Sequence, residues 1–226
     1  MMRPQPNGAL VIFDLDGTLV DSAPDLLASM TYALDLLNID VPTMASMTSY
    51  IGNGAGRLVH RCLTNSFDGT ADEALFDQAS KRFFDHYGAN VCAKSALFPC
   101  VTSTLSELKN CGYRLACVTN KPARFTEPLL AQIGLSEFFS ITLSGDSLDK
   151  KKPAPDQLLY AAEWCDTSPE RCTMVGDTVT DIEAAHRANI QVISVSYGYG
   201  SRRDLLASSP VAIVDSIDQI IDIIAG

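Results

Sequence analysis

The sequence lacks any apolar run that approaches the roughly 20 residues of a membrane-spanning helix. It also lacks a surplus of basic residues, because 17 Lys and Arg stand against 27 Asp and Glu, which gives a net charge of -10. This negative charge argues against nucleic acid and anionic membranes as partners, since both are themselves polyanions. Residues 1–8 contain no apolar segment long enough for an export signal, so we expect a cytoplasmic protein.

Thiol chemistry also has little support. The seven cysteines are odd in number and form no C-x-x-C pair, so we expect reduced side chains and no disulfide framework. A catalytic thiol would need a basic partner, and the three histidines (His60, His86 and His186) fall in helix-like segments without a motif. No heptad pattern or exposed apolar stripe decides between a monomer and a homodimer.

Hydrophobic residues make up 46% of the 226 residues, which is enough for one or two domains with a sizeable core. A short apolar run at residues 11–13, bounded by turn residues, predicts a buried strand. Apolar residues then recur at helical spacing over 23–37, and further helices are predicted at 43–50, 54–65 and 72–86. An all-helical block therefore follows directly after the first strand.

From residue 97 onward, strands and helices alternate. The predicted helices are 101–109, 122–133, 155–165, 179–188 and 217–224, and the predicted strands are 113–119, 138–143, 172–175, 191–195 and 210–214. Such alternation implies a parallel sheet with helices on both faces. We therefore predict an α/β protein with a Rossmann-like parallel-sheet core (1–20 and 92–226) and an inserted α-helical cap (21–91), joined by hinges near 17–22 and 89–99.

Polar residues capable of chemistry follow the predicted core strands or precede a helix at the same edge: Asp14, Asp16, Thr119, Asn120, Lys152, Asp177 and Asp181. Because the carboxyl ends of parallel strands share one edge, we expect these side chains to converge. Clustered carboxylates repel one another, and a divalent ion would neutralise them. Carboxylates, waters and a substrate phosphate are the ligands that Mg²⁺ prefers, although Mn²⁺ accepts the same set. The pattern predicts a phosphoryl-transfer site with an aspartyl nucleophile.

The stretch DLDGTLVDS at 14–22, with Thr119, a Lys-Pro pair and a Gly-Asp-x-x-x-Asp run ending at Asp181, resembles the haloacid dehalogenase superfamily over essentially the whole chain. The resemblance implies that Asp14 attacks phosphorus, and that Asp16 protonates the leaving oxygen and then activates water. A C–halogen cleaver needs neither a general acid for an alkoxide nor a metal ion. Asp16, together with Asp177, therefore favours a phosphatase or mutase over a dehalogenase.

The same resemblance implies the remaining site roles. Asp14, the backbone carbonyl of Asp16 and Asp177 would bind the metal ion, with Asp181 as a more distant or water-mediated partner. Thr119 and Asn120 would contact the transferring phosphoryl group. The family's lysine directly precedes proline, which selects Lys152, and Lys151 stays an alternative.

A glycine-rich turn at Gly52, Asn53 and Gly54 opens a helix that carries Arg57. Such a turn exposes backbone N–H groups and is a ready anion site, although it is equally typical of a tight helix–helix connection, and Arg57 could be a plain surface charge. With the resemblance, this cap suits a small phosphate ester with a carboxylate opposite its phosphate, and we expect hydrolysis of 2-phosphoglycolate. The alternatives are another small phosphomonoesterase acting on a sugar phosphate, a phosphomutase, and a non-catalytic phosphate-binding module.

Overall fold

The computed structural model describes residues 8–225. The expectation about an export signal concerned residues 1–8, and of these residues 1–7 lie outside the described part of the chain. The core is a six-stranded sheet in which every neighbouring pair is parallel. In sheet order the strands are β5 (Ile141–Leu143), β4 (Arg114–Val118), β1 (Leu10–Phe13), β6 (Cys172–Gly176), β7 (Gln191–Val195) and β8 (Ala212–Val214).

Strand β1 lies at the centre of the sheet because all four of its residues are apolar and buried. Val11 and Phe13 point into the layer formed by α5 (Val101–Asn110), α6 (Ala123–Ile133) and α10 (Ile220–Ala225). Leu10 and Ile12 point into the opposite layer, formed by α7 (Asp156–Trp164), α8 (Val179–Ala188) and α9 (Arg202–Ala207). The alternation of side chains along β1 thus supplies two hydrophobic cores, one on each face.

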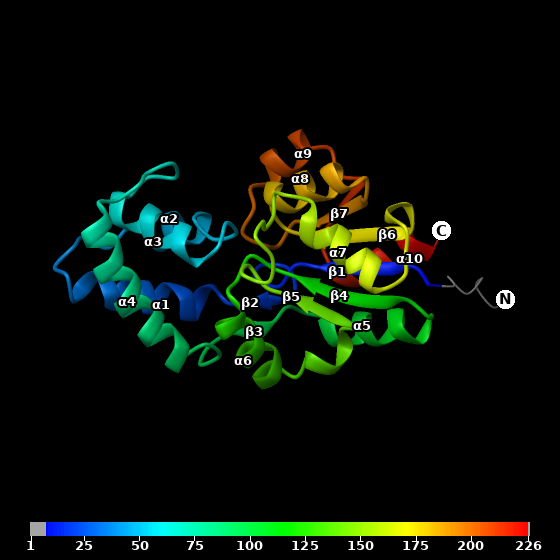
Figure 1. Cartoon of the computed structure of the whole chain (residues 1–226), viewed down its shortest axis with the longest axis horizontal. Coiled ribbons are helices and arrows are strands. Elements are labelled where there is room, and N and C mark those ends of the chain that lie inside the picture. Colours follow the sequence, from blue (N-terminus) through cyan, green and yellow to red (C-terminus); the bar gives the residue numbers. More distant parts are fainter. Residues whose placement is uncertain (1–7, 226) are drawn as a thin grey trace.

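Four helices form a separate block off one end of the sheet, opposite the end where the N-terminus lies (Figure 1). They are α1 (Ala23–Asp35), α2 (Met44–Ser49), α3 (Ala55–Thr64) and α4 (Glu73–Ala89), and α1 and α4 pack along each other. The two chain segments that connect this block to the sheet meet as a short antiparallel pair, β2 (Val20–Asp21) and β3 (Ala96–Leu97). The block is therefore tethered beside the strand ends that carry the polar residues.

The structure confirms the α/β fold class. The described part of the chain holds no helix long and apolar enough to cross a membrane, and all seven cysteines are free. The sequence did not predict α9 or the β2–β3 pair. The strand predicted at 138–143 begins only at Ile141, because residues 136–138 form a 3₁₀ turn.

Ser22 stands at the N-cap position of helix α1 without making the capping hydrogen bond. Its hydroxyl instead donates to Asp16 Oδ1 at 2.5 Å. Asp25, in the first turn of the same helix, is buried and accepts hydrogen bonds from the backbone N–H groups of Lys94 and Ser95. These two side chains thus fasten the connections between the helical block and the core.

Candidate active site

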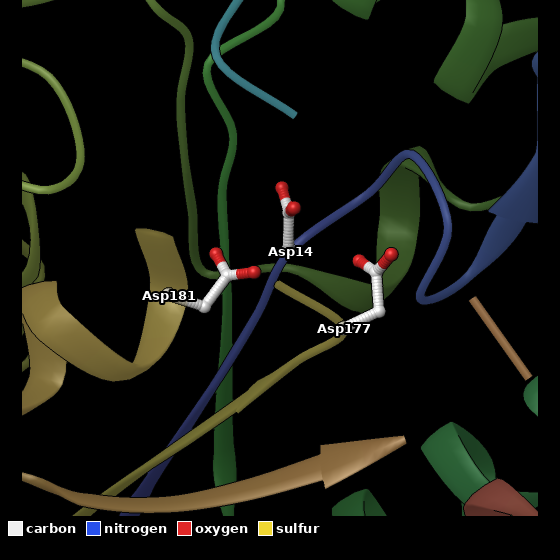
Figure 2. Close-up of side chains that lie close together, drawn as sticks. All are labelled: Asp14, Asp177 and Asp181. Atoms are coloured by element: carbon white, nitrogen blue, oxygen red, sulfur yellow. The ribbon is translucent and has the colours of Figure 1, made fainter. Parts of the chain in front are cut away.

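Three buried carboxylates meet at the carboxyl edge of the sheet. Asp14 directly follows β1, Asp177 follows β6, and Asp181 lies in the first turn of α8. Figure 2 shows these side chains grouped around one space, and one oxygen from each lies within 4.8 Å of the others. The convergence predicted from the strand order is therefore present in the structure.

Lys152 lies beneath this cluster and is buried. Its Nζ is 2.9 Å from Asp14 Oδ1 and 2.7 Å from Asp181 Oδ1, and it donates to the carbonyl oxygen of Val118 at 2.6 Å. Burial lowers the pKa of Lys152, but the adjacent carboxylates more than offset this and raise its pKa, so the group is a permanent cation. Lys152 therefore donates hydrogen bonds to Val118 and Asp181 and forms an ion pair with Asp14, which places it to orient the Asp14 carboxylate.

One lysine does not neutralise three carboxylates. The pKa of Asp14 is raised to about 7, because burial outweighs the opposing charge of Lys152 and the charge of Asp181 adds to the rise. Burial likewise raises the pKa of Asp177, and the charges of Asp181 and Asp14 add to this. Asp14 Oδ1 is buried and ion-paired with Lys152 but receives no well-aligned hydrogen bond from the described residues. A buried set of oxygen donors with surplus negative charge fits a hard divalent cation such as Mg²⁺.

Asp177 is held in place by the loops on either side of it. Its two oxygens accept hydrogen bonds from Thr18 Oγ1 at 2.9 Å and from the backbone N–H of Tyr199 at 2.8 Å. Gly17, at φ +86°, packs so closely that an added Cβ would lie 2.3 Å from Asp177 Oδ2. Glycine is therefore required after Asp16 both for the turn and for the approach to the carboxylate.

Asp181 has both of its oxygens engaged. Oδ1 accepts from Lys152, and Oδ2 accepts from the backbone N–H of Thr178 at 3.0 Å and from its hydroxyl at 2.7 Å. The arrangement is a capping box at the start of α8. Asp181 is thus placed to orient Lys152 and to begin the helix.

Asp16 lines the same pocket as Asp14, with its side chain 13% exposed. Lys121 Nζ donates to both of its carboxylate oxygens, at 3.1 and 3.2 Å, and also to Tyr87 Oη of α4 at 2.5 Å. We did not assign Lys121 a role from the sequence. The signal that could have identified it is the unbroken polar run from Thr119 to Lys121 directly after a buried strand.

Thr119 and Asn120 both line the pocket beside Asp14. Thr119 Oγ1 accepts a hydrogen bond from the N–H of Lys121 at 3.2 Å, which leaves its hydroxyl proton available for a phosphate oxygen. Asn120 Nδ2 donates to the carbonyl oxygens of Lys152 and Gly52, at 2.9 and 3.1 Å. Asn120 therefore joins the sheet edge to the turn before α3. Lys152 contacts Asp14 but does not itself line the pocket.

The turn before α3 closes over the site from the helical block. Gly52 and Gly54 line the pocket, and Asn53 Nδ2 donates to Thr180 Oγ1 of the core at 2.8 Å. Gly54 has φ +90°, and a Cβ there would lie 2.7 Å from Lys151 Nζ. Arg57 is not brought to the pocket. Its guanidinium donates to the carbonyl oxygens of Gly69 and Phe67.

The resulting pocket is lined by residues of both the sheet edge and the helical block. Its polar lining residues include Asp14, Asp16 and Thr119, and its apolar lining residues include Leu26, Leu58 and Phe125. Two carboxyl groups thus face a space that residues of the helical block also border.

Comparisons with known proteins place this chain among hydrolases of one family. Residues 11–195 match the family model of the haloacid dehalogenase-like hydrolases. Relatives called phosphoglycolate phosphatase from Nitrosococcus oceani and Thiobacillus denitrificans are 39% and 41% identical, over 97% and 95% of this chain and 96% and 94% of their own. The crystal structure of a predicted phosphoglycolate phosphatase from Haemophilus somnus 129pt has a TM-score of 0.89 at 37% identity, covering 95% of this chain and 97% of that one.

Proposed function

The chain belongs to the haloacid dehalogenase-like hydrolases, and we propose that it is a Mg²⁺-dependent phosphatase that converts 2-phosphoglycolate into glycolate and phosphate through an aspartyl-phosphate. Two relatives that share about two fifths of its residues bear the name of this activity. The observation that carries the proposal is that Asp14 and Asp16 both line one pocket. This pair supplies a nucleophile and an acid–base group for a single phosphate ester.

In the first step of the proposed reaction, a carboxylate oxygen of Asp14 attacks phosphorus while Asp16 gives its proton to the departing glycolate oxygen. In the second step, Asp16 takes a proton from a water molecule that attacks the same phosphorus, and the carboxylate of Asp14 is released with free phosphate. Lys152 keeps Asp14 oriented throughout, and Thr119 donates to a phosphate oxygen.

The carboxylates of Asp14 and Asp177, with the backbone carbonyl of Asp16, would hold the Mg²⁺ ion. Bound there, the ion supplies positive charge that offsets the acidic cluster and the phosphate oxygens. We assign Asp181 to positioning Lys152, because its own oxygens are already engaged by Lys152 and Thr178.

Mg²⁺ should stabilise the protein more at about pH 8 than at about pH 5. Because the folded pKa of Asp14 is raised to about 7 from 3.8, the metal-free folded state binds more protons than the unfolded state between these values. The stability of the metal-free protein therefore falls as the pH rises through this range. Mg²⁺ offsets this loss of stability, because it supplies the positive charge that the protons supplied at lower pH. Melting temperatures with and without excess MgCl₂ test this, and an equal rise at both pH values would contradict it.

The matched control for this measurement is Asp177→Asn. Its amide keeps the shape of Asp177, and it can accept from Tyr199 N–H while donating to Thr18 Oγ1. Without its charge, the Mg²⁺-dependent rise in melting temperature should largely disappear. The metal-free variant should melt higher than the unaltered protein at about pH 8, because one buried charge is removed.

We further propose that residues 21–91 act as a cap on the core (1–20 and 92–226). The cap would move about hinges at residues 17–22 and 89–99. Three contacts across the pocket support this: Tyr87 with Lys121, Gly52 with Asn120, and Asn53 with Thr180. Where the chain leaves the core for the helical block, Tyr199 Oη accepts hydrogen bonds from the backbone N–H groups of Ser22 and Ala23. The same hydroxyl donates a hydrogen bond to Asp21.

Tyr199→Phe should destabilise this connection by about 1–3 kcal/mol, because two backbone donors at the start of α1 lose their acceptor. We also expect a lower kcat, since the lost hydroxyl holds the start of the cap, while the backbone N–H that binds Asp177 remains. Urea unfolding and phosphate release measure the two effects. Tyr160→Phe, at an exposed site on α7, is the control and should change neither. An unchanged unfolding midpoint in Tyr199→Phe would contradict the assignment.

A phosphate-release screen over small phosphate esters, with and without Mg²⁺, tests the proposed function. The account predicts a strong preference for 2-phosphoglycolate and no appreciable turnover after chelation of the metal. A broad profile across sugar phosphates would reduce the assignment to a general phosphatase. An isomerised product with little free phosphate would instead identify a phosphomutase.

The net charge of -10 and the free cysteines support a cytoplasmic enzyme of small phosphate esters.

A further inference from the structure

Lys121 is the one cationic residue that lines the pocket in the described part of the chain. Its side chain is only 3% exposed, although its Nζ lies at the cavity that holds Asp14 and Asp16. A buried lysine at a ligand pocket costs free energy unless an anion accompanies it. In this structure the accompanying anion is Asp16, the proposed acid–base group.

The position of Lys121 is fixed from both sides of the pocket. It comes from the loop after β4, and Tyr87 of α4 holds its Nζ through the phenol oxygen at 2.5 Å. The Tyr87 ring is buried, stacks on Phe83 and meets Phe125 edge to face. The ammonium group is therefore held in one place by a rigid aromatic support rather than by a flexible surface chain.

The substrate's geometry brings its second anionic group to this point. In 2-phosphoglycolate a single methylene separates the carboxylate from the ester oxygen that Asp16 must protonate. A carboxylate so close to that oxygen must lie within a few ångströms of Asp16, and Lys121 Nζ is 3.1 Å from Asp16. Arg57, the cap cation suggested by the sequence, is engaged by Gly69 and Phe67.

We propose that Lys121, supported by Tyr87, recognises the carboxylate of the substrate, an inference that rests on the proposed function. When the substrate binds, its carboxylate takes the place of Asp16 in the ion pair with Lys121. Asp16 is then free to turn towards the ester oxygen while Ser22 Oγ still holds it at 2.5 Å. A substrate without the carboxylate would leave Asp16 paired with Lys121, so recognition and proton transfer are coupled.

The test compares 2-phosphoglycolate with ethyl phosphate, which has the same two-carbon frame and lacks the carboxylate. For Lys121→Met we expect the ratio of kcat/KM between the two substrates to fall by about 30-fold or more, mainly through KM for 2-phosphoglycolate. Lys121→Arg should restore part of the preference, and Tyr87→Phe should lower it less than Lys121→Met. Lys150→Met removes an exposed lysine that pairs only loosely with Asp156, and should leave the ratio unchanged.

An alternative role for Lys121 is to position Asp16 and nothing else. In that case Lys121→Met would lower kcat by the same factor for both substrates, and this equal loss would overturn the inference. A preference that survives in Lys121→Met would overturn it as well, while leaving the proposed function standing. If the unaltered enzyme showed no preference for 2-phosphoglycolate, the proposed function would fall, and the inference with it.

Discussion

Asp14→Asn should lower kcat for 2-phosphoglycolate by about a thousandfold or more, because an amide cannot form the acyl phosphate that the proposed reaction requires. The exchange also withdraws one of the charges offered to Mg²⁺. The fold should survive, since Lys152 keeps its contacts with Asp181 and the carbonyl of Val118. Phosphate release in excess MgCl₂, with the melting temperature recorded on the same samples, separates loss of chemistry from loss of structure.

The matched control for Asp14→Asn is Asp149→Asn, which alters an exposed carboxylate in the loop that leads to Lys152. It should retain full activity, because it lies outside the residues that line the pocket. If Asp14→Asn kept comparable activity, the nucleophile would have to be another residue, and the role given to Lys152 would lose its basis.

Lys152→Met should abolish activity and also destabilise the protein by about 3–5 kcal/mol at pH values near 8, the cost of leaving buried charges without their partner. Both Asp14 and Asp181 contact its Nζ, and both are buried. Urea unfolding of the metal-free and Mg²⁺-bound protein measures the change. Because Mg²⁺ offsets part of the same negative charge, the loss should be smaller with the ion bound.

Lys151→Met provides the comparison, since Lys151 is the adjacent lysine, is exposed, and does not contact the carboxylates of the cluster. We expect it to unfold at the same urea concentration as the unaltered protein. If the two variants behaved alike, the selection of Lys152 over Lys151 by its place before proline would be mistaken.

The strand-end residues could be predicted from the sequence because parallel topology alone brings them together. Asp14 and Asp177 each follow a buried apolar strand directly, and such strands end at one edge whatever the details of their packing. The helical block could also be predicted, since helical spacing is a local property. The short strands β2 and β3 could not, because two residues each carry too little pattern.

The network around Asp16 could not be predicted, because it depends on contacts between distant segments. Tyr87 meets Lys121 only because the end of α4 returns to the sheet, and Tyr199 reaches Ser22 from 177 residues away. Arg57 is displaced from the pocket by a similar effect, since the loop after α3 folds back and offers its carbonyl oxygens. Tertiary contacts, rather than the motifs, therefore decide which cation lines the pocket.

The most direct test of the account is to trap the phosphoryl group on the protein. The enzyme is mixed with 2-phosphoglycolate and Mg²⁺, quenched within one turnover and reduced with borohydride, which converts an aspartyl-phosphate into homoserine. The account predicts homoserine at position 14 by peptide mass spectrometry, and its absence from Asp14→Asn treated in the same way. Phosphate release in a single turnover with no modification at Asp14, or with modification at another aspartate, would contradict it.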